Sequence, residues 1–332
     1  MKKTLLAWLF VVAALSATAQ ERVLFVGNSL TYFNDMPTLF ENIAAAKGHR
    51  VSVESYTVGG AGLAEMVASG EVVRLVESER WDKVVLQPGT GESAGGSIAT
   101  DSVAAVVRSL IEVLHRGSPE AKVCLYEISN GITPGDGEGD YDYYLVTQQR
   151  ILDSVTRIAR LSGVCFAPAG ECFREHYATN HDLMLHSSFN DVHPNLAGSY
   201  LVACAIFETI YEEPVVPCDF YSTLDRDQAE YLQEIADRVV LPNRERWLMG
   251  AGEEEDDTLS IGSVKSDYLR IYPNPTTRLV HIEARGEVLV CDLRGNRRTV
   301  EIRNGLLDLS ALEPGVYYLQ VGERKEKVVV CR

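Results

Sequence analysis

Between residues 22 and 250 the chain alternates short apolar runs with longer stretches of helical periodicity. The apolar runs are Val23–Val26, Val51–Tyr56, Lys83–Leu86, Lys122–Ile128 and Val164–Ala167. The helix-like stretches are Pro37–Lys47, Leu63–Ser78, Ser102–His115, Tyr143–Leu161, Leu196–Tyr211 and Gln228–Val240. Strands separated by helices indicate βαβ units, whose parallel sheet is covered on both faces. We therefore expect a three-layer α/β/α domain with a five-stranded parallel sheet.

The first 20 residues have the composition of an export signal. Lys2 and Lys3 precede an apolar run from Leu5 to Leu15, and Ala17-Thr18-Ala19 is a small-residue cleavage pattern. This run is shorter than the ~20 apolar residues that span a bilayer, and no later segment approaches that length. The sequence therefore predicts a signal peptide in residues 1–20 and an exported protein without a transmembrane segment.

A change in composition divides the rest of the chain. Residues 249–268 are rich in Gly, Ser and acidic residues, including the run Glu253 to Asp257, and predict a solvated, flexible linker. Residues 269–332 contain short alternating runs broken by turns, which predict a small all-β sandwich. The predicted order is a signal peptide (1–20), an α/β domain (21–248), an acidic linker (249–268) and a β-sandwich (269–332).

Charge and cysteine content limit the classes of partner and cofactor. A formal net charge of −16 disfavours nucleic acid and anionic membranes as partners. The seven cysteines include no CxxC pair and no Cys/His metal spacing, so we expect no metal and no cofactor. In an oxidising compartment Cys165–Cys172 or Cys204–Cys218 could form disulfides. The alternative is that the cysteines are buried as small apolar side chains.

A serine, a histidine and an acid lie where an open α/β sheet places its chemistry. Ser29 follows the first predicted strand, and the carboxyl ends of such strands carry the sites of these folds. His193 can take the serine proton, and Asp191 can orient the imidazole. The backbone N–H groups of Ser29 and Gly60 and the side-chain amide of Gln87 follow strands one, two and three, and predict an oxyanion hole. Singly, such residues are more often a helix cap, a structural histidine or a tight turn, but their convergence predicts acyl transfer.

The same blocks resemble the SGNH, or GDSL-like, hydrolase superfamily. Gly27 to Pro37 resembles the opening block GNS-x-T-Y-x-N-D-M-P of a bacterial branch, and His193 to Leu201 resembles its closing block HP-x-x-x-G-S-Y-L. The resemblance covers residues 22–215. It implies a flavodoxin-like sheet with strand order 2-1-3-4-5 and serine-dependent ester hydrolysis without a metal.

Two positions depart from the superfamily pattern. Gln87 stands where the superfamily usually has an asparagine, although its amide can donate the same hydrogen bond from one methylene further out. The residue three positions before His193 is Asn190 rather than an acid, and Asp191 lies two before it. Two arrangements therefore stay open: a triad completed by Asp191, or a Ser–His dyad oriented by a backbone carbonyl.

The C-terminal residues 270–332 resemble a type IX secretion C-terminal sorting domain. The segments that carry this resemblance are Ile271–Pro275, Val288–Gly295, Leu307–Leu312, Gly315–Tyr318 and Lys327–Val330. The resemblance implies the type IX secretion machinery as a partner, and a location outside the cell or on the outer surface of a Gram-negative bacterium. The alternative is an ordinary accessory β-sandwich, such as a carbohydrate-binding module.

Together these features predict an exported serine esterase. The resemblance and the export signal further imply that it removes small acyl groups, such as acetyl, from carbohydrate. Tyr141, Tyr143 and Tyr144 could stack on a sugar ring, or they could begin a helix and pack inward. Two other functions stay open: a lipase- or thioesterase-like hydrolase of longer acyl esters, and a non-catalytic glycan-binding surface protein. The polar loop Gly89–Gly96 does not obviously provide a long acyl groove.

Overall fold

The computed structural model describes residues 20–134 and 139–249, and, towards the C-terminus, 271–272, 276, 279–282, 287–292, 296–302, 306–321 and 324–330. The chain divides into two compact units, Met1–Glu255 and Asp256–Arg332, and this division falls inside the predicted linker. The predicted signal peptide and linker lie almost wholly outside the described residues.

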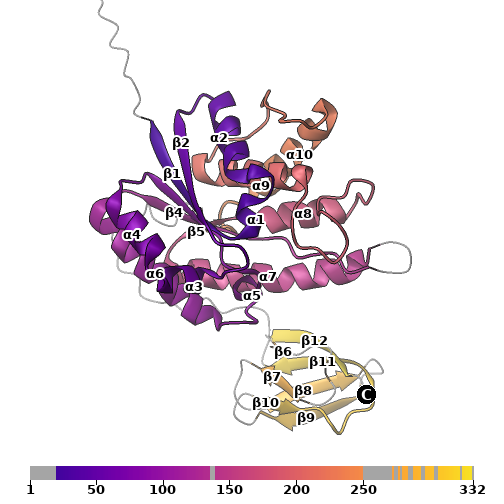
Figure 1. Cartoon of the computed structure of the whole chain (residues 1–332). Coiled ribbons are helices and arrows are strands. Elements are labelled where there is room, and N and C mark those ends of the chain that lie inside the picture. The colour runs from indigo at the N-terminus through magenta and orange to yellow at the C-terminus, as the bar shows by residue number, and fades with distance from the viewer. Residues whose placement is uncertain are drawn as a thin grey trace, which may run out of the picture. The chain divides into compact units, whose positions relative to one another are not determined.

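The first unit is a parallel sheet with helices on both faces (Figure 1). Its strands are β1 (Glu21–Gly27), β2 (Val51–Thr57), β3 (Lys83–Leu86), β4 (Lys122–Tyr126) and β5 (Cys165–Ala167). They are ordered β2-β1-β3-β4-β5, with Val23 of β1 opposite Val53 of β2 and Lys83 of β3. The predicted fold class and strand order are confirmed.

The helices of this unit follow the predicted alternation closely. They are α1 (Ser29–Tyr32), η1 (Phe33–Asp35), α2 (Met36–Ala46), α3 (Leu63–Ala68), α4 (Glu71–Ser78), α5 (Thr90–Ser93), α6 (Thr100–Gly117), α7 (Tyr141–Ser162), α8 (Ala169–Tyr177), α9 (Leu196–Tyr211), α10 (Arg226–Val239) and η2 (Leu241–Asn243). Helices α3, α4, α6 and α7 lie on one face of the sheet, and α2, α9 and α10 lie on the other (Figure 1). The single helix predicted over Leu63–Ser78 is two helices, because the left-handed Gly70 (φ 76°) interrupts it.

Burial explains why β1 and α9 are apolar almost throughout. Val23 to Val26 of β1 are fully buried, because β1 is flanked by two strands and covered on both faces. Helix α9 packs against α2, α8 and α10, so nearly its whole circumference is buried. The edge of the sheet that carries the candidate site therefore rests on a rigid core.

The two disulfides that the sequence left open are not formed. Cys165, Cys172, Cys204 and Cys218 are all free thiols. Cys172 and Cys204 lie within helices and are fully buried, and burial raises the pKa of both thiols well above its ordinary value. Cys172 and Cys204 therefore act as small apolar core residues, which was the alternative prediction for the cysteines.

The second unit is built from antiparallel strands in two sheets, with the orders β10-β7-β6 and β12-β11-β8-β9 (Figure 1). The strands are β6 (Ile271–Tyr272), β7 (Leu279–Ile282), β8 (Glu287–Asp292), β9 (Arg297–Glu301), β10 (Leu306–Asp308), β11 (Gly315–Val321) and β12 (Arg324–Val330). Buried side chains of both sheets, including Val280, Val290, Leu307 and Leu319, form one core. The predicted β-sandwich is confirmed.

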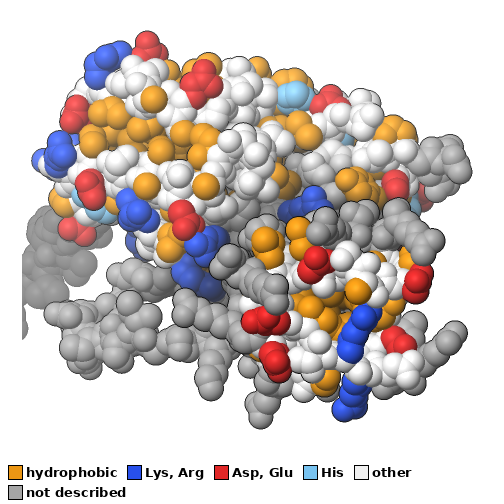
Figure 2. All heavy atoms as spheres, turned by 90° about the horizontal axis from the view of Figure 1, so that it is seen from below, with side chains coloured by type: hydrophobic (Ala, Val, Ile, Leu, Met, Phe, Trp, Pro, Cys, Tyr) orange, Lys and Arg blue, Asp and Glu red, His pale blue; other side chains and the backbone are white. Residues whose placement is uncertain are grey.

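Helix hydropathy and surface charge both bear on the kinds of partner that the protein can have. No helix among the described residues is long and apolar enough to cross a membrane. On the face seen in Figure 2, acidic and basic side chains lie among apolar ones and do not form a field of one sign.

Candidate active site

Ser29 is the first residue of α1 and sits directly after β1. Asn28 caps this helix, because its Oδ1 accepts the backbone N–H of Leu30 at 3.1 Å. Its Nδ2 donates to the carbonyl of Ala61 at 3.0 Å, which ties the turn to the loop after β2. Gly27 has no room for a side chain, since a Cβ there would lie 2.2 Å from Oγ1 of Thr31. The turn is therefore tight, and it holds Ser29 at the carboxyl edge of the sheet.

The structure brings Ser29, His193 and Asp191 together. Nε2 of His193 lies 2.8 Å from Oγ of Ser29, and Nδ1 of His193 lies 2.6 Å from Oδ1 of Asp191. The same Oδ1 accepts the backbone N–H of His193 at 2.9 Å. The acid reaches the imidazole despite the two-residue spacing because Asn190 is left-handed (φ 63°) and turns the loop back. This geometry matches the triad arrangement rather than the dyad.

The hydrogen bonds around Asp191 favour the ionised form of its carboxyl group. The hydrogen bond from the backbone N–H of His193, and then the one from its side chain, hold the pKa of Asp191 below its ordinary value. An ionised carboxylate on Nδ1 fixes the imidazole tautomer, so that Nε2 can accept the proton of Ser29.

Two of the predicted oxyanion donors are backbone N–H groups that lack an acceptor among the described residues. Those of Ser29 and Gly60 donate to no acceptor within the part of the chain that the structure describes. Gly60 has a φ of 75°, which favours glycine, and no atom lies within 4 Å of the position of a Cβ there. Free backbone donors on the loops next to the nucleophile are the kind of group that oxyanion stabilisation uses.

The placement of Gln87 differs from the sequence-based expectation. Its side chain is fully buried, and its Oε1 accepts the backbone N–H of Asn28 at 2.8 Å and the hydroxyl of Thr31 at 3.1 Å. Its Nε2 donates to the neighbouring carbonyl of Pro88. Both ends of the amide are thus engaged inside the protein. Gln87 braces the turn that carries Ser29, and in this geometry it does not present a donor to a substrate.

A buried carboxylate that sequence reasoning missed joins the loops after β2 and β3. Glu92 is 2% exposed and accepts the backbone N–H groups of Leu63 at 2.7 Å, Ala64 at 2.9 Å and Gly89 at 2.8 Å. These bonds satisfy the otherwise unpaired N-terminus of α3, which follows directly on the Gly60 loop. The only sequence signal is an acid three residues after a glycine at a helix start, which is too common to single out.

The loop that carries Asp191 packs on the segment after β4. The N–H of Asn190 donates to the carbonyl of Ile132 at 2.7 Å, and a Cβ at Gly131 would lie 3.0 Å from the carbonyl oxygen of Asp191. Gln148 of α7 holds the same segment, because its Oε1 accepts the N–H of Asn130 at 2.8 Å. The position of the acid therefore depends on α7.

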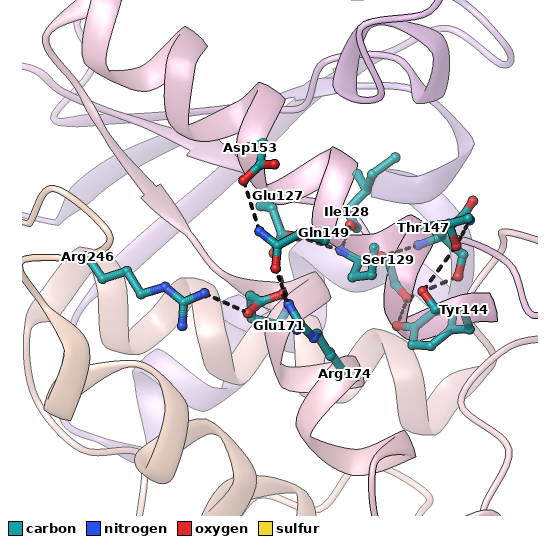
Figure 3. Close-up of polar contacts among 12 residues, drawn as sticks. Glu127, Ile128, Ser129, Tyr144, Thr147, Gln149, Asp153, Glu171, Arg174 and Arg246 are labelled. Atoms are coloured by element: carbon teal, nitrogen blue, oxygen red, sulfur yellow. Dashed lines mark hydrogen bonds and ion pairs between the residues drawn. The ribbon is translucent and has the colours of Figure 1, made fainter. Parts of the chain in front are cut away.

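Beneath that segment lies a buried polar network (Figure 3). Glu127 accepts Nε2 of Gln148 at 2.5 Å and the backbone N–H of Glu171 at 3.1 Å. Burial, and then the neighbouring Glu171, raise the pKa of Glu127 well above its ordinary value. Glu171 in turn pairs with Arg174 and Arg246, each at 3.3 Å. These residues come from the position directly after β4, from α7 and α8, and from the segment after η2, so no local pattern could predict their meeting.

The tyrosines considered for sugar binding are placed mostly inward. Tyr141 and Tyr144 begin α7 with exposed fractions of 8% and 0%, and only Tyr143 is exposed. The helix-start alternative is therefore confirmed for two of the three. Among the described residues, no group of three or more His, Cys, Asp or Glu side chains could hold a metal ion.

The comparison with protein families concerns the C-terminal unit. A family model described as the secretion system C-terminal sorting domain matches residues 270–330. These residues are a secretion sorting domain. The sorting domain directs export by the type IX route to the cell surface or the extracellular space, as predicted from the sequence, and it indicates interaction with that machinery.

Solved structures are similar to the α/β unit. A DUF4886 family protein from Bacteroides uniformis ATCC 8492 matches with 19% identity and a TM-score of 0.55, over 67% of this chain and 95% of that one. TesA matches with 18% identity and a TM-score of 0.44, over 59% and 100%. A variant of Axe2, an acetyl xylan esterase from Geobacillus stearothermophilus, matches with 18% identity and a TM-score of 0.43, over 61% and 97%. The first of these matches shows a shared fold for the α/β unit. A search of curated protein sequences finds no match.

Proposed function

We propose that the α/β unit is an exported serine esterase. Oγ of Ser29 attacks the ester carbonyl while its proton passes to Nε2 of His193, and Asp191 stabilises the imidazolium that forms. The N–H groups of Ser29 and Gly60 hold the oxyanion. His193 then protonates the leaving alcohol, and a water molecule, activated in the same way, releases the acid. The observation that carries the proposal is the continuous contact from Ser29 through His193 to Asp191, at 2.8 Å and 2.6 Å.

Among ester substrates we favour acetyl esters over the longer acyl esters of a lipase or thioesterase, because the loop Gly89–Gly96 is polar and Gly-rich and offers no evident apolar groove. We propose acetylated carbohydrate as the substrate class of this exported protein.

The first experiment measures p-nitrophenyl acetate hydrolysis by the mature chain, residues 21–332. Ser29→Ala should abolish turnover, because no other hydroxyl takes its place at Nε2 of His193. Asp191→Asn should lower kcat by up to ~10⁴-fold, because the imidazole loses its orienting charge. Ser109→Ala, which changes an exposed serine on α6, serves as the matched control and should retain full activity.

The outcomes separate the competing functions. Equal inertness of wild type and Ser29→Ala on nitrophenyl and sugar acetates would leave the non-catalytic glycan-binding function. A preference for octanoate over acetate among nitrophenyl esters would favour the lipase-like function. An unchanged rate in Asp191→Asn would mean that the site works as a dyad.

A further inference from the structure

Tyr32 and Phe33 form an aromatic wall beside the triad. The Phe33 ring stacks on the imidazole of His193, with centroids 4.2 Å apart and planes inclined by 22°. The Tyr32 ring adjoins it, with centroids 5.8 Å apart. At the other end, the Tyr32 hydroxyl lies 3.1 Å from where a Cβ of Gly59 would be. The wall therefore runs from the imidazole to the glycine loop that holds Gly60.

The backbone holds this wall rigidly in place. Asn34 and Asp35 follow it with φ of 54° and 53°, left-handed conformations that cost energy in residues other than glycine. Nδ2 of Asn34 donates to the carbonyl of Pro194 and to Oγ of Ser199, both at 2.9 Å. Oγ of Ser199 donates to the carbonyl of Phe33 at 3.2 Å. These bonds lock the wall to the segment that carries His193.

One end of the wall is open to solvent. The Tyr32 side chain is 43% exposed, although most large aromatic side chains of this unit are buried. Its hydroxyl makes no hydrogen bond with the residues that the structure describes. An exposed ring with a free hydroxyl, fixed next to a nucleophile, is suited to a ligand that has both an apolar face and hydroxyl groups.

The reaction decides which part of the substrate meets the wall. His193 must deliver its proton to the leaving alcohol, so this alcohol lies beside the imidazole. Phe33 already covers one face of the imidazole, and the next ring is Tyr32. Resting on the proposed esterase function, we propose that the Tyr32–Phe33 wall is the subsite for the alcohol part of the ester, and that it binds a pyranose ring. The C–H face of the sugar packs on Tyr32, and the Tyr32 hydroxyl bonds a sugar hydroxyl.

The test compares two acetate esters that differ only in their alcohol. The mature chain is assayed on a peracetylated methyl glucopyranoside and on glycerol triacetate. Tyr32→Ala should lower kcat/KM for the sugar ester about 10-fold, mainly through KM, because an aromatic contact of this kind contributes about 1.4 kcal/mol. The value for glycerol triacetate should change less than about two-fold. Tyr32→Trp, which keeps an aromatic face, should restore most of the sugar activity.

Several outcomes would overturn this assignment without touching the esterase proposal, which Ser29→Ala tests separately. An equal loss on both esters would make Tyr32 a structural residue. An unchanged rate on both would mean that the sugar does not contact it. A shift in acyl-length preference among nitrophenyl esters, with the sugar ester unaffected, would place the wall on the acyl side. Tyr221→Ala, which removes a half-buried tyrosine that contacts Arg226 and Glu230, controls for general effects of losing a ring.

Discussion

At the scale of the single residue, Asn34 combines two requirements that usually conflict. It adopts a left-handed backbone, which glycine would tolerate better, yet its side chain makes the two bonds that fix Pro194 and Ser199. Asparagine is one of the few side-chain-bearing residues that enters this region readily. The position therefore favours asparagine because the backbone and the site both depend on it.

Substitution of Asn34 should separate these two requirements. Asn34→Ala should lower both Tm and kcat, because alanine in the left-handed region costs ~1 kcal/mol and the anchor of the His193–Pro194 segment is lost. Asn34→Gly should keep most of the stability. Its kcat should fall about 10-fold, as in Asn34→Ala, with KM nearly unchanged. Melting curves and steady-state kinetics on p-nitrophenyl acetate measure both. Full activity in Asn34→Gly would show that the anchor does not position His193.

At the scale of the element, the catalytic edge is assembled from loops that are held by buried side chains. Glu92 clamps the loops after β2 and β3, Gln87 braces the turn after β1, and Gln148 supports the segment after β4. Each of these side chains satisfies backbone groups that strands and helices leave unpaired at their ends. The loops at this edge are therefore rigid, although they have little regular structure of their own.

Glu92→Gln should test this clamp. Glutamine replaces one carboxylate oxygen by an NH₂ group, which cannot accept a hydrogen bond from the backbone N–H groups that face it. Losing such a buried hydrogen bond to a carboxylate costs ~1.5–3 kcal/mol of stability. We expect Tm to fall by about 5 °C and kcat to fall, because the Gly60 loop shifts relative to Ser29. Glu112→Gln, on the exposed face of α6, should leave both unchanged. A stable but inactive Glu92→Gln would still fit the clamp, whereas a variant with wild-type Tm and kcat would contradict it.

At the scale of the whole molecule, the α/β unit buries an acid between α9 and α10. Glu208 is fully buried, lies near Asp237, and accepts the N–H of Val215 at 3.4 Å. Burial, and then the neighbouring Asp237, raise the pKa of Glu208 to about 10, from an ordinary 4.5. The folded state therefore keeps a proton that the unfolded chain releases above pH 4.5. As a result, the contribution of Glu208 to stability is greatest below pH 4.5 and declines as pH rises towards 10.

Glu208→Gln should flatten the dependence of stability on pH. The neutral amide has the same shape and needs no proton, so the variant should melt above wild type at pH 8 and close to it at pH 5. The slope removed is about 1.4 kcal/mol per pH unit within this window. Thermal melts at several pH values measure it, with the exposed Glu234→Gln as control. Parallel curves for wild type and Glu208→Gln would refute the assignment of this pH dependence to Glu208.

The sequence alone determined what depends on local pattern. Alternating apolar runs and helical periods predicted the five strands and their helices, because burial of one face imposes those periods on the chain. The turn after the first strand and the His-Pro block marked Ser29, His193 and Asp191, and the segments after residue 270 marked the sorting domain.

The contacts between segments far apart in the chain were decided by the tertiary structure alone. Sequence reasoning could not see that Gln87 turns inward to Asn28, that Phe33 stacks on His193, or that Glu92 joins two loops. It also left open disulfides for cysteines that are in fact free thiols. Such contacts are fixed by packing between elements far apart in the chain, and a short-range pattern carries no information about them.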